Sequence, residues 1–132
     1  MPNITRKTLL RSVEFERGEL YSRMNGRRCL FARCTPRLEI YEHETTVPIL
    51  GEGRKIKKVS YSLVICQDLD LTRPTREDDF STVTVYDLSA QILKEDGVYQ
   101  VITFDNIIPS EIHLDGDWIF ETQLPEELKK II

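Results

Sequence analysis

The residues that could support catalysis or metal binding are few and lie far apart in this chain. His43 and His113 are its only histidines, and neither stands at a spacing typical of a metal site or an activated nucleophile. Cys29 and Cys34 are five residues apart, which places them on opposite faces of a strand and disfavours joint chelation of a metal. We therefore predict no catalytic residue, no metal site and no bound cofactor.

Four short patterns could bind an ion or a phosphate, and three of them lack a required feature. Neighbouring glutamates on a strand, as in residues 39–44, are usually only solvated. The glycines of residues 51–53 lack the spacing of a phosphate-binding loop, and residues 76–79 lack the ligand spacing of a calcium loop. The cations of residues 54–58 stay open as a phosphate contact. We expect that the protein is not an enzyme.

Length and composition indicate one soluble domain spanning residues 1–132. A chain of 132 residues can bury about two-thirds of its unfolded surface. The apolar fraction is 40% and the charged fraction 30%, as in globular proteins, and no apolar run is long enough to span a membrane. Residues 1–20 carry charges where a signal peptide needs an apolar core. Three cysteines, an odd number, fit reduced thiols in a cytoplasm better than a set of disulfides.

Charge is unevenly distributed along the chain. Residues 1–38 contain nine Lys/Arg and three Asp/Glu, a balance of +6, whereas residues 81–132 contain three and ten, a balance of −7. The two ends either pair inside one fold or form a basic and an acidic face, and the second arrangement favours head-to-tail association of identical subunits. The overall charge of −4 argues against sequence-specific nucleic-acid binding.

Alternation of apolar and polar residues predicts a mostly β fold. We expect a single antiparallel β barrel or sandwich with a long extended loop and at most one or two short helices. The predicted elements are a hairpin over 19–34 around Asn25-Gly26, strands over 37–44 and 58–69, a hairpin over 82–104 around Glu95-Asp96-Gly97, a strand over 118–124 and a helix in 125–132. Residues 7–20 are ambiguous between helix and strand, and residues 70–81 are typical of a loop or a short helix.

The order of these segments resembles a known family. The stretch NGRRCLFARCTPRLEIYEHETTVPILGEGRKIKKVSYSLVICQD is similar to the first half of phage tail-tube proteins of Gram-positive, myophage-like elements. These proteins have a short hairpin, a strand, an apolar VPxLG-type turn, a basic loop and a long strand. The ending TFDNIIPSEIHLDGDWIFETQLPEEL resembles the family's FDE turn, aromatic strand and proline-containing tail. The basic loop lacks the family's histidine and glycine-rich sequel, so a tube initiator or terminator stays open beside the major tube subunit.

The resemblance implies a structural function. Family members are small β barrels that form six-membered rings, and these rings stack into a tube. This implies a homo-oligomer, with sheath, tube-initiator and tape-measure proteins as further partners. It also implies assembly in the host cytoplasm before incorporation into the tail of a phage or related contractile injection machine. Acidic residues opposite the core face, such as Glu39, Glu42 and Glu121, are candidates for a lumen that repels phosphates.

By the same resemblance, a loop reaches a neighbouring subunit. We expect residues 45–58 to be mobile in the free subunit and ordered on assembly, since two glycines and clustered cations favour disorder. The candidate assembly residues are Val47, Pro48, Ile49, Leu50, Arg54, Lys55, Lys57 and Lys58. The alternative is a flap over the subunit's own core.

A second function class stays open. The chain could be a monomeric β-sandwich module that recognises a protein or a polysaccharide. In that case the aromatic residues Tyr41, Tyr61 and Trp118 would be exposed and would cluster in one groove.

Overall fold

The computed structural model describes residues 4–24, 27–49, 52–65, 70–71, 85–112 and 117–131. The elements of this part, in chain order, are β1 Ile4–Glu14, β2 Arg17–Met24, β3 Arg27–Cys34, β4 Arg37–Ile49, β5 Glu52–Ile65, β6 Asp70–Leu71, β7 Val85–Leu93, β8 Tyr99–Ile112, β9 Trp118–Thr122 and the helix α1 Glu126–Lys129. The fold is therefore mostly β with one short helix among the described residues, as the alternation predicts.

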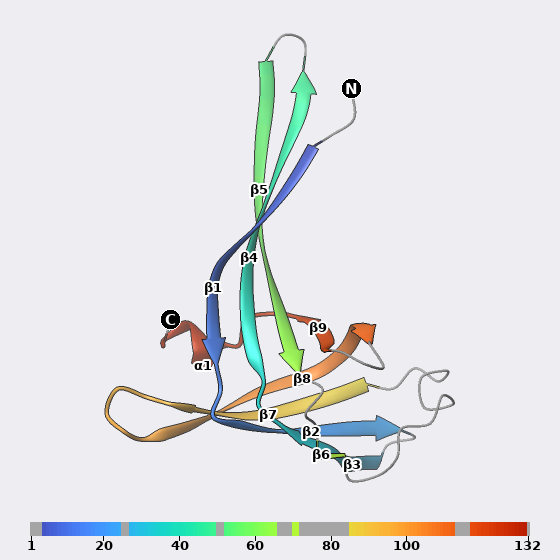
Figure 1. Cartoon of the computed structure of the whole chain (residues 1–132), viewed down its shortest axis with the longest axis vertical. Helices are drawn as coiled ribbons and strands as arrows, with labels where there is room; N and C mark the ends of the chain where they lie inside the picture. The colour runs from blue at the N-terminus through green and yellow to red at the C-terminus, as the bar shows by residue number, and fades with distance from the viewer. Residues whose placement is uncertain are drawn as a thin grey trace.

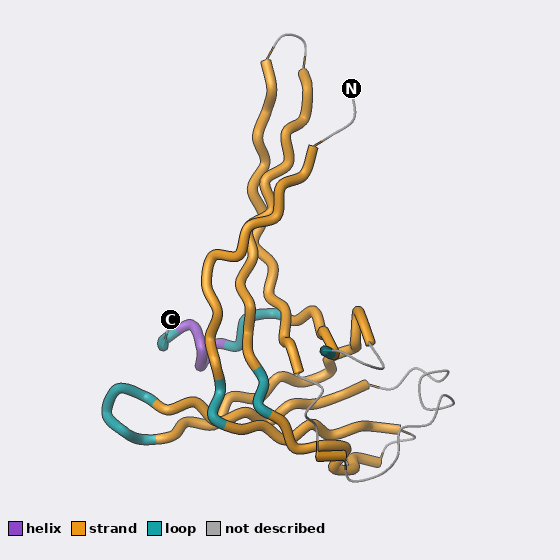
Figure 2. The backbone as a smooth tube through the Cα atoms, in the orientation of Figure 1, coloured by secondary structure: helices purple, strands orange, loops and turns teal. Residues whose placement is uncertain are grey.

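All of the described strands belong to one antiparallel sheet. Their order is β1-β4-β5-β9-β8-β7-β2-β3-β6, so the sheet is open, with β1 at one edge and β6 at the other. Long strands bend this sheet into two parts (Figures 1 and 2). We call the projecting part the stem, formed by residues 4–12, 41–49 and 52–60, and the rest of the described chain the body. The predicted barrel is not closed in the described residues.

The core lies where the lower ends of β1, β4 and β5 pack over the strands of the body. Their inward side chains are buried with those of β2, β3, β7, β8 and β9 and with Leu128 of α1. Aromatic rings fill the centre: Phe31 lies 5.3 Å from Trp118 and Tyr86 lies 5.6 Å from Phe120, measured between ring centroids. One continuous core thus joins the stem's base to the body.

Burial follows the alternation of apolar and polar residues in β7 and in the lower part of β5. In β7 the alternate residues Tyr86, Leu88, Ala90 and Ile92 are all buried. In β5 the same alternation ends partway, since Leu63 and Ile65 are buried but Val59 is 52% exposed. Burial stops at this point because the strand leaves the body and enters the stem.

Two predicted hairpins are present. β7 and β8 are joined by a turn in which the Gly97 amide donates to the Lys94 carbonyl (2.9 Å), and Gly97 has the positive φ of 81° that glycine tolerates best. β2 pairs with β3 up to Met24↔Arg27, which leaves Asn25 and Gly26 between them, outside the described residues.

The ambiguous residues 7–20 form strands, not a helix. The chain changes direction between β1 and β2, where the Phe15 amide donates to the Pro36 carbonyl (3.1 Å). A Cβ on Gly18 would lie 3.0 Å from the Pro36 ring and 3.2 Å from Leu88, so glycine permits this close approach. Tertiary contacts at the bend thus decide the strand conformation.

The C-terminal helix is confirmed over Glu126–Lys129, with Pro125 as its N-cap rather than its first helical residue. Lys129 donates to Glu126 at 2.8 Å, one turn earlier. Of the segment 70–81, only Asp70–Leu71 is described, as the short strand β6. The rest of that segment and His113 lie outside the described residues.

The division between stem and body predicts different mutational costs for two leucines. Leu38 at the stem's base is fully buried, whereas Leu9 in the stem is 48% exposed. We expect Leu38→Ala to lower the free energy of unfolding by about 2–5 kcal/mol and Leu9→Ala by less than about 0.5 kcal/mol. Urea denaturation of the dilute protein measures both values. Equal losses would contradict the location of the core.

Candidate functional site

The stem contains the predicted assembly segment, and that segment is not a loop. β4 and β5 pair at every position from Arg37↔Val64 to Ile49↔Glu52 without a register shift. The β-branched residues 45–47 favour extended backbone, and Pro48 lies beyond Thr46, the last β4 residue that pairs with β1. The prediction of a loop is therefore wrong for residues 45–49 and 52–58, which are paired strand.

The structure places the candidate assembly residues on both strands of this hairpin. Val47 is partly buried and Pro48 exposed, and the side chains of Arg54, Lys55, Lys57 and Lys58 are exposed. Ile49 is the last residue of β4, and Leu50 lies outside the described residues. The hairpin thus keeps the apolar residues on one strand and the cations on the other.

The four cations do not face one another, because strand alternation divides them between two faces. Lys55 lies 3.5 Å from Glu44 and Lys57 lies 3.4 Å from Glu42 on one face. Arg54 and Lys58 lie on the other face. The expected mutual repulsion is therefore reduced within the subunit, although each exposed ion pair contributes at most about 1 kcal/mol.

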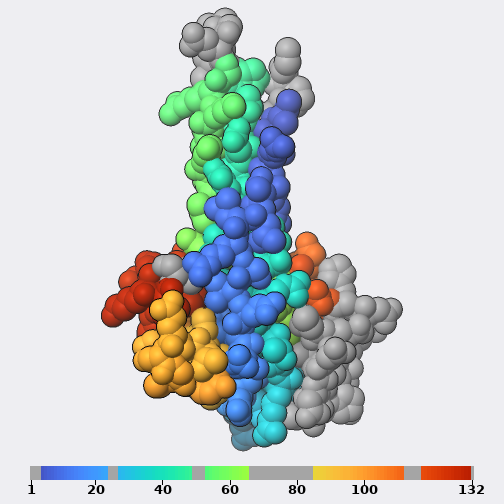
Figure 3. Space-filling view, turned by 60° about the vertical axis from the view of Figure 1, so that its left-hand side comes forward, coloured from blue at the N-terminus to red at the C-terminus, as the bar shows by residue number. Residues whose placement is uncertain are grey.

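The stem has no core of its own. Every described side chain of β1 from Ile4 to Ser12 is exposed. Space-filling atoms show the stem as a narrow column above the wider body (Figure 3). The large exposed aliphatic side chains on it are Ile4, Leu9, Leu10, Ile56 and Val59. These side chains are divided between the two faces of the stem, so each face offers apolar groups among charged ones.

A groove of about 590 Å³ lies at the foot of the stem. It is lined by β5 residues 59–62, by β8 residues 103–107 and by residues 121–125, with Lys7 and His43. Hydroxyl, amide and carboxylate groups predominate in this lining. Such a groove suits a polar ligand or a polar segment of another chain.

The groove also brings together His43 and Ser60, a pair that sequence reasoning missed. His43 Nε2 lies 2.7 Å from Ser60 Oγ, within hydrogen-bonding distance. The two residues are 17 positions apart, and only the β4–β5 register makes them diagonal neighbours on one face. No described group of at least three His, Cys, Asp or Glu side chains is arranged to hold a metal ion.

The three glutamates proposed for a lumen do not share a face. Glu39 of β4 and Glu121 of β9 lie on either side of Ser62 in β5. Both are on the face of the sheet that points away from the core. Glu42 has the same strand parity as buried Leu38, and it pairs with Lys57. The prediction that Glu42 faces away from the core is therefore wrong.

The aromatic cluster expected of a binding module does not form. Trp118 is buried in the core beside Phe31, so it does not supply the exposed ring that the binding-module alternative requires. Tyr41 is partly buried, with Lys7 Nζ 4.1 Å from its ring centroid. Burial, together with a hydrogen bond that its hydroxyl donates to Glu39 (3.0 Å), raises the pKa of Tyr41.

The prediction that the cysteines of β3 lie on opposite faces is wrong, because the β-bulge at Leu20/Tyr21 shifts the register and pairs Cys29 with Ser22 and Cys34 with Gly18, on one face of β2. Cys29 is exposed, whereas Cys34 is buried and its thiol donates to the Gly18 carbonyl at 3.6 Å. Cys66 lies outside the described residues. No helix in the described part of the chain is long and apolar enough to cross a membrane.

These positions predict unequal thiol reactivity. We expect Cys29 to react with a water-soluble disulfide reagent in the native protein, and Cys34 to react only after unfolding, since burial excludes the reagent. The measurement compares absorbance traces of the wild type with those of Cys29→Ser and Cys34→Ser. Loss of a fast-reacting thiol in Cys34→Ser, but not in Cys29→Ser, would contradict the assignment of Cys29 as exposed and Cys34 as buried.

Comparison with protein-family models, with curated proteins and with solved structures found no match for this chain. The features of the molecule that bear on its function are the stem, the groove and the sheet edges.

Proposed function

We propose that this chain is a self-assembling structural subunit of the kind that forms stacked rings or a tube in phage tails and related injection machines. The observation that carries the proposal is the stem: three long strands whose lower ends lie in the core and whose upper parts leave the body and have no core of their own. The part of β4 over residues 41–49 is about 30 Å long at ~3.3 Å per residue. A projection of that length reaches well past the subunit's own body.

The exposed aliphatic side chains of the stem support a contact with another subunit. Ile56 and Val59 lie on the projecting part of β5 and are 43% and 52% exposed. Burying each such side chain against a partner contributes about 1.5–3 kcal/mol before the costs of association. The stem points away from the body (Figure 1), which does not favour the alternative of a flap over the subunit's own core.

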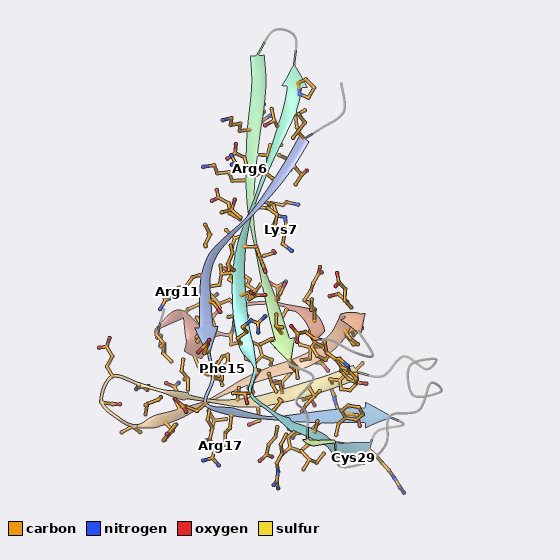
Figure 4. All side chains as sticks on the ribbon, in the orientation of Figure 1. Arg6, Lys7, Arg11, Phe15, Arg17 and Cys29 are labelled. Atoms are coloured by element: carbon orange, nitrogen blue, oxygen red, sulfur yellow. The ribbon has the colours of Figure 1, made fainter. Side chains whose placement is uncertain are left out.

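The open sheet provides a second means of association. Among the described residues, β1 (Ile4–Glu14) is an edge strand and pairs on one side only, with β4. Unpaired backbone groups along such an edge can accept a strand from a neighbour. Arg6, Lys7 and Arg11 follow this edge (Figure 4) and favour an ordered neighbour over uncontrolled aggregation.

The proposed partners are further copies of the chain, with sheath, tube-initiator or tape-measure proteins in the complete particle. Assembly takes place in the host cytoplasm in this proposal, and the product becomes part of a particle tail. A hexameric ring is the expected unit from the tail-tube resemblance.

The polar groove favours one alternative function, a monomeric module that binds a protein or a polysaccharide. The groove is lined by Ser60, Thr103, Asn106 and Gln123, side chains that hydrogen-bond sugars and peptides well. A size measurement separates the two functions, because a binding module stays monomeric at all concentrations.

Two exposed valines provide a matched test of the assembly proposal. Val59 lies on the stem, and Val98 lies beside the β7–β8 turn with a similar exposure of 58%. We expect the wild type to form rings or filaments at high concentration and Val59→Asp to lose them, because a carboxylate cannot be buried at an apolar contact. Analytical ultracentrifugation and negative-stain electron microscopy measure the assembly.

Val98→Asp is the control and is expected to assemble as the wild type does. Both variants should unfold within about 2 °C of the wild type, since surface substitutions of this kind change stability little. A wild type that stays monomeric up to millimolar concentration at low and high salt would refute the proposal. If Val59→Asp lost assembly only together with several degrees of stability, the stem would be a structural element and not a contact surface.

A further inference from the structure

The side of the body sheet that faces away from the core carries an arginine-rich surface. Strand alternation places the outward residues of β2, β3 and β7 on one face, because their neighbours Gly18, Leu20, Ala32 and Leu88 are buried. We call this surface the basic face; it consists of Arg17, Glu19, Tyr21, Arg23, Arg28, Leu30, Arg33, Asp87, Ser89 and Gln91. Four arginines against two acids give it a net charge of +2.

Both acids of the basic face already have partners within the subunit. Asp87 lies 2.9 Å from Arg23 and 3.8 Å from Arg28, and it also accepts a hydrogen bond from the Asn106 amide at 2.9 Å. Glu19 accepts a hydrogen bond from the Tyr21 hydroxyl, which raises the pKa of Tyr21. The basic face therefore has no spare carboxylate of its own among the described residues.

Arg17 and Arg33 are exposed, and no described carboxylate lies within 4.0 Å of either guanidinium. Arg28 lies over the Tyr21 ring, with its guanidinium carbon 4.1 Å from the ring centroid. Arginine and tyrosine are the residue types enriched at the energetic centres of protein interfaces. The composition of this face is thus typical of a protein interface whose partner surface carries negative charge.

The same face continues into an apolar end on the β7–β8 hairpin. Leu93 pairs with Tyr99, Gln91 pairs with Val101, and the three apolar residues are 46–52% exposed. They share the strand parity of Gln91, which lies opposite Arg17. The surface therefore combines an apolar patch with two arginines, Arg17 and Arg33, that have no carboxylate partner in the described part of the subunit.

The opposite, stem-facing side of the body is acidic. The segments there, residues 105–112 of β8 and residues 117–131, carry six carboxylates and two lysines, a balance of −4; the acids are Asp105, Glu111, Asp117, Glu121, Glu126 and Glu127. Asn106 forms hydrogen bonds with Arg23 and Asp87, so this side and the basic face adjoin at that residue. We call these segments the acidic side. In the middle of the acidic side, exposed Ile108 pairs with exposed Glu121. The acidic side, like the basic face, therefore combines an apolar group with charge.

We infer that the basic face of one copy docks on the acidic side of the next copy. The two surfaces lie on opposite sides of the body: Arg17 points away from the stem (Figure 4), whereas α1 and β9 lie beside the stem's base (Figure 1). Copies stacked along the long axis bring them together, and the stem of each copy then passes beside the body of the next. The contact is heterologous and repeats without closing, as a tube requires.

This inference rests on the proposed function and specifies which surfaces stack. A second copy is the occupant that the charges favour, because a balance of +2 meets a balance of −4 and each surface offers an exposed apolar group to the other. The stem cations are a competing partner for the acidic side, and the experiment separates the two arrangements.

The test uses complementary charge reversals in the full-length chain. We expect Arg33→Glu and Glu121→Lys each to raise the concentration needed for assembly at least about tenfold at roughly 50 mM salt, with a smaller effect at about 500 mM, where screening is strong. An equimolar mixture of the two variants should assemble near the wild-type concentration, since the glutamate introduced in one variant meets the lysine introduced in the other. Lys94→Glu, on the β7–β8 turn, changes the charge equally and is expected to assemble as the wild type does. Sedimentation velocity measures all four samples.

Recovery of assembly in the mixture supports the docking of these two surfaces. If Glu121→Lys weakens assembly while Arg33→Glu does not, the acidic side meets another surface and the inference fails, although the proposed function stands. If both variants are impaired and the mixture does not recover, the inference likewise fails. If the wild type itself never assembles, the proposed function fails with it. Thermal unfolding of each variant within about 2 °C of the wild type confirms that the substitutions act at the surface.

Discussion

The uninterrupted antiparallel pairing of β4 with β5 is the constraint on which the rest of the structure depends. At their lower ends these strands bury Leu38 and Leu63 in the core, and at their upper ends both faces meet solvent. A pair of strands alone is marginally stable in water. The stem persists because its base is anchored in the core and because β1 adds a third strand along most of its length. One pairing register therefore determines the position of the stem, the groove and the faces of the stem cations.

Charge and shape act together in this molecule. The chain is acidic overall, yet the basic residues gather on the stem and on the basic face, and the acids gather on the acidic side between them. Within a subunit only some of these charges pair, as in Lys57 with Glu42 and Arg23 with Asp87. Unequal pairing of this kind leaves surfaces of opposite sign on opposite sides of one body. Such a body is suited to directional self-association, which is the physical basis of both proposals.

The groove favours ligand binding and the stem favours self-assembly. These two functions do not exclude each other. A polar groove at the base of a projection is also where a neighbouring chain would insert a polar segment. His43 and Ser60 lie there as hydrogen-bonding groups that such a segment could use. The buried position of Trp118 removes the exposed aromatic surface that carbohydrate recognition commonly uses, because the ring is part of the central aromatic cluster. This weighs toward a structural subunit.

The sequence by itself determined the fold class, the inward face of β7, the two hairpins and the terminal helix. These features follow from local periodicity and turn chemistry, whereas the β-bulge that puts Cys29 and Cys34 on one face depends on the pairing of β2 with β3. Only the tertiary structure decided that residues 45–49 and 52–58 are strand, that Val59 is exposed and that Trp118 is buried. Periodicity within one segment reveals which side chains share a face, but not whether another element covers that face. The pairing of distant strands settles this, and with it the separation of the basic face from the acidic side.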